Sequence, residues 1–274
     1  MPASPDSRPF WRKLGSSALE TLRVYVNNRH SPLYREWYHQ HRLDLKSFRN
    51  KHAGEDCFII GNGPSLNKMD LVPLRDRYTF GLNKIYLMEE RGVDLNLDYL
   101  VSVNPLVIEQ SAKVFEGLNC DTFLSYRAAH DHVRPLDHIH YLYTGGPYTF
   151  SRSLTERIHE GHTVTFVAMQ IAYYMGFRCV FLIGVDHSFQ AEGKPNEKQR
   201  MEGSDPNHFD PDYFAGDEWH LPDLEASELS YHLARFFYRR DGRQIIDATV
   251  DGQLDIYPKI SYEEALGRST ASVS

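Results

Sequence analysis

The most constraining feature of the sequence is a series of short apolar runs that alternate with turns and helix-like stretches from Asp56 onward. CVFLIGVD at 179–186 is the strongest run, and it follows an apolar stretch at 164–177 that has the length of a helix and is closed by Gly176. Other runs lie at 57–61, 78–83, 98–104 and 243–249, with weaker ones at 120–126 and 138–143. Strands that alternate with helices predict an α/β fold: a doubly wound, Rossmann-like domain with a mostly parallel sheet and helices on both faces.

The length and composition fit one such domain with additions. The chain has 274 residues, of which 41% are hydrophobic and 24% charged. These values are ordinary for a globular protein and exclude a disordered, collagen-like or coiled-coil chain. We expect a helical appendage over 1–50, a Rossmann-like main domain over 51–260 and a C-terminal tail over 261–274. Residues 188–222 lack a period and are rich in Pro, Gly, Asn and acidic residues, which is typical of a functional lid or of a disordered segment; we expect a lid.

The appendage over 1–50 is basic and aromatic, with nine Lys or Arg against four Asp or Glu. Such a segment could lie on an anionic membrane surface or bind a partner protein, or its helices could pack on the main domain or on a second copy of the chain. A homo-oligomer is expected. The first residues lack the apolar stretch of a secretory signal, no apolar run is long enough to span a bilayer, and three cysteines form no disulfide framework. We therefore expect a cytoplasmic protein, with attachment to the inner face of the membrane left open.

Charge argues against nucleic acid as a partner. The net charge is −7, and residues 186–228 hold twelve Asp or Glu against three Lys or Arg. A nucleic-acid-binding domain would show a broad basic face instead.

Small or polar residues follow four of the predicted strands. These are GNGPSL at 61–66, Asn83, Asn104 with its following proline, and GVDHS at 184–188. Ligands of open α/β sheets bind at the carboxyl ends of the strands, and an asparagine amide both donates and accepts hydrogen bonds without adding charge. We expect these residues to form a ligand site.

The string GNGPSL has glycines that permit a sharp turn and a close approach of backbone to ligand. It matches neither GxGxxG nor GxxxxGK[ST], and it lacks the lysine of the latter. A Rossmann dehydrogenase and a P-loop nucleotidase are therefore disfavoured.

FIIGNGPSL, GLN at 81–83, VN at 103–104, the apolar helix after Thr163 and FLIGVD at 181–186 together resemble the bacterial sialyltransferases that use CMP-activated sialic acid. They also resemble the larger group named after the archaeal 6-hydroxymethylpterin diphosphokinase, many of whose bacterial members are associated with surface-polysaccharide or flagellin glycosylation. The resemblance covers roughly residues 56–250.

The resemblance implies a glycosyltransferase that moves a sugar, such as a sialic-acid-like nonulosonate, from a CMP donor to a glycan or lipid-linked glycan acceptor in surface-polysaccharide biosynthesis. It implies His208, which Phe209 follows, as general base on the acceptor hydroxyl. The donor-binding residues that it implies are Gly61, Asn62, Gly63, Pro64, Ser65, Asn83, Asn104, Thr163, Thr165, Asp186 and Ser188. No metal or cofactor is expected, because neutral donors and a helix N-terminus can meet the charge of one leaving phosphate.

Two alternatives remain open. The sialyltransferases carry a tyrosine that stabilises the leaving phosphate where this chain has Ser188. This difference leaves open whether the donor is CMP-linked and whether the reaction is a glycosyl transfer. A diphosphokinase acting on a pterin-like alcohol would instead use ATP and Mg²⁺, and the acidic lid offers oxygen and nitrogen ligands for a cation, although without tight spacing. The candidate ligands are Asp186, His187, His208, Asp210, Asp212, Asp217 and His220. A non-catalytic nucleotide-binding subunit, tethered by residues 1–50, is the other alternative.

The remaining histidine pairs and cysteines are interpreted as structural. HDH at 130–132 and HIH at 138–140 have no cysteine or carboxylate ligand set beside them, and Cys57 and Cys179 fall inside apolar strands.

Overall fold

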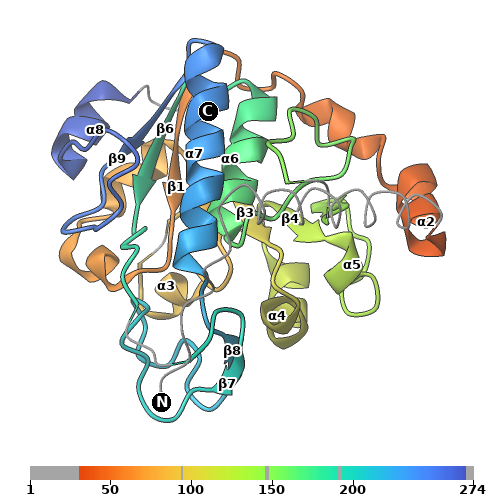
Figure 1. The fold of residues 1–274 in the computed structure, drawn as a ribbon, viewed down its shortest axis with the longest axis horizontal. Helices are drawn as coiled ribbons and strands as arrows, with labels where there is room; N and C mark the ends of the chain where they lie inside the picture. The colour runs from red at the N-terminus through yellow and green to blue at the C-terminus, as the bar shows by residue number, and fades with distance from the viewer. Residues whose placement is uncertain (1–30, 94, 146–147, 190–192, 270–274) are drawn as a thin grey trace, which may run out of the picture.

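The computed structural model describes residues 31–93, 95–145, 148–189 and 193–269 (Figure 1). Within these residues the main sheet has seven strands in the order β5-β4-β3-β2-β1-β6-β9, and every neighbouring pair is parallel. The strands are β1 Asp56–Ile60, β2 Tyr78–Leu82, β3 Tyr99–Ser102, β4 Asp121–Ser125, β5 Ile139–Leu142, β6 Cys179–Ile183 and β9 Gln244–Asp247. The predicted Rossmann-like α/β fold is confirmed, and each predicted strand is present.

The strand order reverses at β1, which starts the sheet in sequence and lies near its centre. From β1 the chain adds strands in one direction as far as β5, and then crosses back to place β6 on the other side of β1. The carboxyl ends of β1 and β6 therefore flank the switch point, where ligands of such sheets bind.

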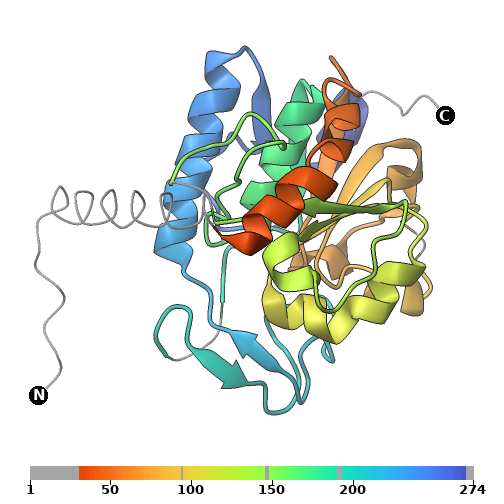
Figure 2. The same ribbon diagram turned by 90° about the vertical axis from the view of Figure 1, so that its right-hand side faces the viewer.

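Helices cover both faces of the sheet (Figures 1 and 2). Helices α6 (Val164–Met175) and α7 (Leu224–Arg240) lie on one face, and the connections between β1 and β5 lie on the other. The remaining helical elements are α2 Pro32–Gln40, η1 Asp44–Phe48, η2 Pro64–Lys68, η3 Val72–Asp76, α3 Leu87–Glu90, α4 Pro105–Gly117, α5 Tyr126–Ala129 and α8 Tyr262–Arg268.

Helix α6 is the most buried helix of this fold, which explains why its sequence is apolar on all sides. The hydroxyl of Thr163 accepts a hydrogen bond from the backbone N–H of Thr165 and caps its start. Gly176 ends it in the left-handed conformation, with φ at 95°. Helix α7 begins as predicted after Asp223, whose side chain accepts from the N–H of Ala226.

Residues 31–50 pack on the main domain. Trp37 is fully buried and its indole N–H donates to the carbonyl of Tyr141 at 2.7 Å, beside the edge strand β5. His140 lies between the carboxylates of Asp44 and Asp121, at 2.7 and 3.0 Å, and so ties η1 to the sheet. The rest of the predicted appendage, residues 1–30, lies outside the described residues.

The segment predicted as a C-terminal tail, 261–274, contains helix α8, and its described part up to Ser269 packs on the domain. Tyr262 is buried against Phe58 of β1, and its hydroxyl donates to the carbonyl of Asp70 at 2.9 Å. In the part of the chain that the structure describes, no helix is both long enough and apolar enough to cross a membrane.

The predicted lid folds into a compact unit rather than an extended loop. Its strands β7 (Lys198–Arg200) and β8 (Glu218–His220) form an antiparallel pair. The chain between them buries Phe209, Tyr213 and Phe214, and β8 itself adds the buried Trp219. These side chains give the lid an apolar core of its own where it meets the domain.

Candidate active site

A pocket of about 510 Å³ opens at the carboxyl edge of the sheet, between the strand ends, the start of α6 and the lid. The predicted site residues that line it are Gly61, Asn62, Gly63, Asn83, Asn104, Thr163, Thr165, Asp186, Ser188 and His208. Pro64 and Ser65 do not line it; Ser65 is buried behind the loop. Residues separated by up to 147 positions are thus brought to one place by the topology of the sheet.

The loop after β1 is packed tightly against the loop after β6. A Cβ at position 61 would lie 2.2 Å from the carbonyl oxygen of Gly184, and one at position 63 would lie 1.8 Å from Oδ2 of Asp186. Both glycines are therefore required by close approach within the protein itself.

Asp186 braces this loop from the neighbouring strand. Its carboxylate accepts hydrogen bonds from the backbone N–H of Ser65 at 3.0 Å and from the Ser65 hydroxyl at 2.7 Å. Burial raises the pKa of Asp186, and the two bonds from Ser65 act in the opposite direction. The sequence analysis predicted that Asp186 contacts the donor. In the structure Asp186 lines the pocket, and its hydrogen bonds with Ser65 also hold the loop after β1 in place.

The three asparagines differ in what they can offer a ligand. Oδ1 of Asn83 accepts from the hydroxyl of Ser102 at 3.1 Å, and Oδ1 of Asn104 accepts from the N–H of Leu106 at 2.9 Å as the cap of α4. Both residues line the pocket, and each keeps its amide N–H groups as donors that no hydrogen bond within the described residues uses. Oδ1 of Asn62 is buried and has no hydrogen-bond partner among the described residues. The pocket wall thus combines one unsatisfied acceptor with two sets of donors.

The N-terminus of α6 points into the same pocket. Thr163, Val164 and Thr165 line it, and the Thr163 hydroxyl lies 3.3 Å from the hydroxyl of Tyr231 on α7. A helix N-terminus carries partial positive charge and unpaired N–H groups, so this wall favours an anion. No Lys or Arg of the described residues lines the pocket, so the favourable charge comes from backbone and amide dipoles.

His208 is held on the lid side of the pocket by two contacts. Its Nδ1 lies 2.7 Å from Oδ2 of Asp205, whose side chain is fully buried, and its ring stacks on Tyr213 at 4.0 Å between centroids with the planes 4° apart. A carboxylate bound to Nδ1 accepts the N–H there and leaves Nε2 as the nitrogen that exchanges a proton. An imidazole held in this way is able to act as an oriented general base.

The lid is anchored to the domain through backbone groups beside His208. The N–H of Phe209 donates to the carbonyl of Asn62 at 2.9 Å, and its own carbonyl accepts from Asn67 at 2.8 Å and from Arg91 at 2.6 Å. The loop that carries Asn62 and the lid that carries His208 are thus joined directly.

Lys84 makes a second anchor, deeper in the structure. Its buried ammonium donates to the carbonyl of Tyr213 at 3.0 Å and to Asp217 at 3.3 Å, and it lies 4.8 Å from the centre of the Phe214 ring. Burial lowers the pKa of Lys84, and Asp217 opposes that shift. The lid is therefore held against the strand ends by specific polar contacts around an apolar interface.

Sequence reasoning missed several residues of this site. Asp205 and Tyr213, which orient His208, fall in a region without secondary-structure periodicity; the spacing of three residues between Asp205 and His208 is the one local signal. Glu160 also lines the pocket, and burial raises the pKa of its carboxyl group. It lies in an irregular segment where nothing in the sequence marks it.

Four of the seven side chains proposed as metal ligands line the pocket, but in the described structure they do not form a metal-binding group: Asp186, His187, His208 and His220. Among the described residues, no three His, Cys, Asp or Glu side chains form a group suited to holding a metal ion. His187 is engaged by Glu228 at 2.9 Å, and Asp217 by Lys84. The described side chains therefore do not fit a resident metal site.

The sequence analysis expected no carboxylate ligands beside the HIH pair, but Asp44 and Asp121 lie on either side of the buried His140, where they join η1 to the sheet. Cys57 and Cys179 are free and buried in their strands, and Cys120 is also free and buried.

Comparison with known proteins gives a single result. No curated protein and no solved structure matches the chain. The family model described as 6-hydroxymethylpterin diphosphokinase MptE-like matches residues 33–192, which include the asparagines, the β1 loop and Asp186 but stop short of His208. Since this match spans more than half of the 274 residues, the chain belongs to the MptE-like family.

Proposed function

We propose that the protein is a nucleotide-dependent transferase in which His208 deprotonates an acceptor hydroxyl. The observation that carries this proposal is the Asp205–His208 pair at 2.7 Å, placed on the lid across from a pocket of uncharged donors. A general base of this kind contributes about 10²- to 10⁴-fold to a rate.

For the donor, we propose a CMP-linked sugar of the sialic-acid-like class. The acceptor O–H would give its proton to Nε2 of His208 while its oxygen bonds to the anomeric carbon, and the bond from that carbon to the phosphate oxygen would break. CMP would then leave with one phosphate. The α6 N-terminus and the amides of Asn83 and Asn104 are suited to such a group, because they stabilise modest negative charge without a cation.

Asn62 is proposed to contact the ribose or the base rather than the phosphate. Its unsatisfied Oδ1 requires a hydrogen-bond donor, and a phosphate oxygen is an acceptor. A ribose hydroxyl or the amino group of cytosine can supply the proton. The acceptor of the transfer would be a glycan or lipid-linked glycan, as in surface-polysaccharide biosynthesis.

The family match favours a second candidate, a diphosphokinase that uses Mg·ATP and a pterin-like alcohol. It would use the same base on the same kind of group, a hydroxyl, and so it accounts for His208 equally well. The two candidates differ in the charge that the pocket must hold. The wall formed by the described residues includes Glu160, Asp186 and Asp223 and no Lys or Arg, which suits a nucleoside monophosphate better than a triphosphate, unless Mg²⁺ accompanies the latter.

A nucleotide panel separates the candidates. The thermal midpoint of the full chain would be measured with CMP, UDP, GDP and ATP, each in EDTA and in MgCl₂. A larger rise with CMP in EDTA supports the glycosyltransferase, and a rise confined to ATP with MgCl₂ supports the diphosphokinase. No rise with any nucleotide would refute both.

The His208→Ala variant tests the base. With the donor identified by the panel, its turnover should fall about 10²- to 10⁴-fold while nucleotide affinity stays nearly unchanged. His132→Ala, at an exposed position outside the pocket, is the matched control. Equal turnover by His208→Ala and wild type would refute the proposal that His208 is the general base.

A further inference from the structure

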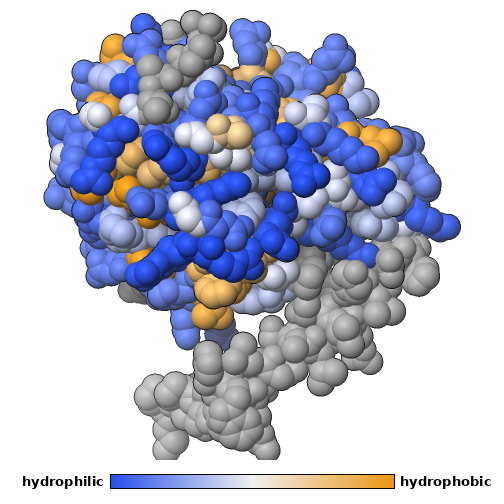
Figure 3. Space-filling model, turned by 90° about the horizontal axis from the view of Figure 1, so that it is seen from above, coloured by the Kyte–Doolittle hydropathy of each residue, from blue (hydrophilic) through white to orange (hydrophobic). Residues whose placement is uncertain are grey.

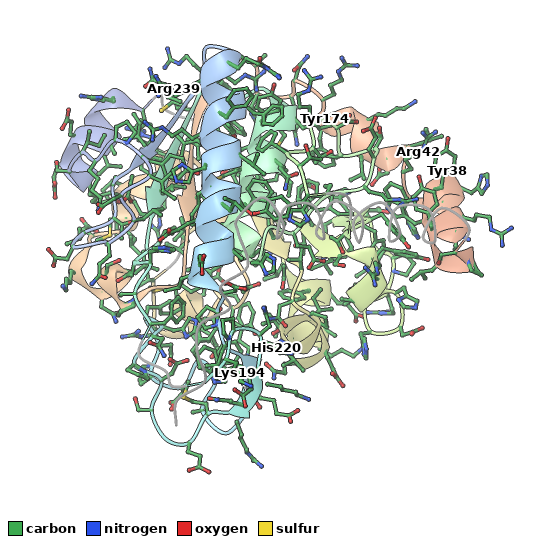
Figure 4. All side chains as sticks on the ribbon, in the orientation of Figure 1. Tyr38, Arg42, Tyr174, Lys194, His220 and Arg239 are labelled. Atoms are coloured by element: carbon green, nitrogen blue, oxygen red, sulfur yellow. The ribbon has the colours of Figure 1, made fainter. Side chains whose placement is uncertain are left out.

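A second cavity, of about 840 Å³, lies at the opposite end of α6 from the candidate active site. Tyr173 and Tyr174, near the C-terminus of the helix, line it, whereas Thr163 and Thr165 line the active site. The rise of an α-helix separates the two by roughly 15 Å. In Figure 4 Tyr38, Arg42 and Tyr174 lie in the upper right part of the molecule, while His220 of the active site lies near the bottom.

This cavity is strongly cationic. It is bounded by α2, the residues on either side of η1, the segment 149–157, the end of α6 and the residue before β9. Its lining includes five arginines: Arg42, Arg49, Arg152, Arg157 and Arg243. Glu156 is the one carboxylate that the described residues contribute to the lining. Five guanidinium groups against one carboxylate leave an excess of positive charge in a concave space, which concentrates anions.

Three of the arginines are fixed by aromatic rings. The guanidinium carbon of Arg42 lies 3.9 Å from the centre of the Tyr38 ring, that of Arg157 lies 4.6 Å from Tyr34, and that of Arg243 lies 4.5 Å from Tyr173. A guanidinium stacked on a ring keeps its N–H groups at its edge, where they bind a phosphate in a planar fork. The cavity wall is therefore preorganised for an anion.

Four of the arginines have no carboxylate partner in the described structure, although Arg243 donates a hydrogen bond to the carbonyl of Tyr173. Among the described residues, no carboxylate is in ion-pair contact with Arg42, Arg49, Arg152 or Arg243. Nε of Arg42 is buried and has no hydrogen-bond partner there. A buried guanidinium N–H without an acceptor is unfavourable, and an anionic ligand would supply that acceptor.

The surrounding surface does not suit an apolar partner. Figure 3 shows the molecule from above, the side on which α6 and α7 end, and hydrophilic side chains dominate this face with only small separate hydrophobic areas. The hydroxyls of Thr149, Ser151, Ser153 and Thr155 add further polar groups to the cavity itself. Charge and hydrogen bonding, rather than apolar contact, are what this site offers.

We propose that this cavity is a second ligand site, which binds a diphosphate group. The number of arginines on several wall segments and the volume of the cavity exceed what one phosphate needs, and guanidinium forks are the side chains best matched to phosphate oxygens. The diphosphate could belong to a soluble molecule or to the head of a lipid. The site is independent of the proposed transfer reaction, because it shares no lining residue with the active-site pocket.

Calorimetric titration of the full chain with inorganic pyrophosphate tests the proposal. Wild type should bind it saturably, and Arg49→Gln with Arg152→Gln should weaken binding at least about tenfold. Both arginines are exposed, so the double variant should fold; the buried Arg157 is left intact. Saturating the candidate active site with CMP should leave pyrophosphate binding unchanged, which separates this site from the catalytic one.

Lys113→Gln with Arg239→Gln is the control for the loss of two positive charges. Both residues are exposed and outside the cavity, and Arg239 lies across α7 from Tyr174 (Figure 4). This control should bind pyrophosphate as wild type does. Absence of saturable binding to wild type, or equal affinity in the Arg49/Arg152 variant, would overturn the proposal.

Vesicle sedimentation distinguishes the two sources of the diphosphate. Phosphatidylcholine vesicles with and without geranylgeranyl diphosphate would be mixed with wild type and with the Arg49/Arg152 variant. Recruitment by the diphosphate lipid that is lost in the variant supports a lipid head group. Binding of free pyrophosphate without such recruitment supports a soluble ligand. Recruitment that is equal for the variant and wild type would contradict the site.

Discussion

Replacing Gly63 with alanine should destabilise the protein through one defined displacement. The added Cβ would lie 1.8 Å from Oδ2 of Asp186, so the carboxylate would have to move by about 1.5 Å to reach ordinary contact. That movement breaks its bonds from the N–H and hydroxyl of Ser65, at 3.0 and 2.7 Å. Hydrogen bonds to a charged group contribute about 1.5–3 kcal/mol each. Because turning toward solvent relieves part of the desolvation of Asp186, we expect a net loss of about 2–4 kcal/mol.

Urea denaturation followed by far-UV circular dichroism measures this loss. The matched control is Gly117→Ala, where the added Cβ would meet nothing within 4 Å at the end of α4, and where alanine should raise stability by about 0.5–1 kcal/mol. In an Asp186→Ala background the cost of Gly63→Ala should fall to about 1 kcal/mol, since only the carbonyl oxygen of Gly184, 2.9 Å away, still obstructs the Cβ. A Gly63→Ala protein as stable as wild type, or a cost unchanged by Asp186→Ala, would refute the reasoning.

Three other predictions concern the lid and the sheet edge. Asp205→Asn should lower turnover by about 10²- to 10⁴-fold with little change in nucleotide affinity, because the amide no longer orients His208 as a base; unchanged steady-state kinetics would contradict this. Lys84→Met should speed hydrogen exchange in 205–220 by removing the donor to Tyr213, and exchange at the wild-type rate would show that this anchor is unimportant. Burial lowers the pKa of His140, but its carboxylate partners Asp44 and Asp121 outweigh burial, and the net pKa is raised. The contribution of His140 to folding stability is therefore present at pH 5.5 and is lost as the pH rises through the pKa of the folded state. The stability difference between wild type and His140→Gln should therefore be larger at pH 5.5 than at pH 8.5 in urea titrations, and an equal or reversed difference would contradict the sign.

The sheet and the strand-end half of the pocket could be predicted because both depend on local patterns. Buried parallel strands are apolar throughout, so the run at 179–186 marks β6 without ambiguity, and the rule for strand carboxyl ends then brings Asn62, Asn83 and Asn104 together. The sharp turn expected at Gly63 is not found, because its backbone is extended with φ at −70°; glycine is needed there by the close packing of Asp186 instead.

The lid half of the pocket could not be predicted to the same depth. The orientation of His208 depends on Asp205 and Tyr213, and the position of the lid depends on Lys84, more than a hundred residues earlier in the chain. Apart from the three-residue spacing of Asp205 and His208, none of these contacts follows a local pattern, so no short window of sequence predicts them. The arginine-lined cavity could not be predicted for the same reason, because its arginines are scattered along the sequence from 42 to 243.

The most direct test of the central claim is a calorimetric titration of CMP into wild type and Asn62→Ala, in EDTA, with the exposed Asn119→Ala as control. Asn62 is the informative position because its buried Oδ1 has no partner in the described structure, so its loss should leave the fold as stable as before. The account predicts saturable binding to wild type and to Asn119→Ala, and about tenfold weaker binding to Asn62→Ala. Equal affinity of all three proteins for CMP, or no binding by wild type, would contradict it.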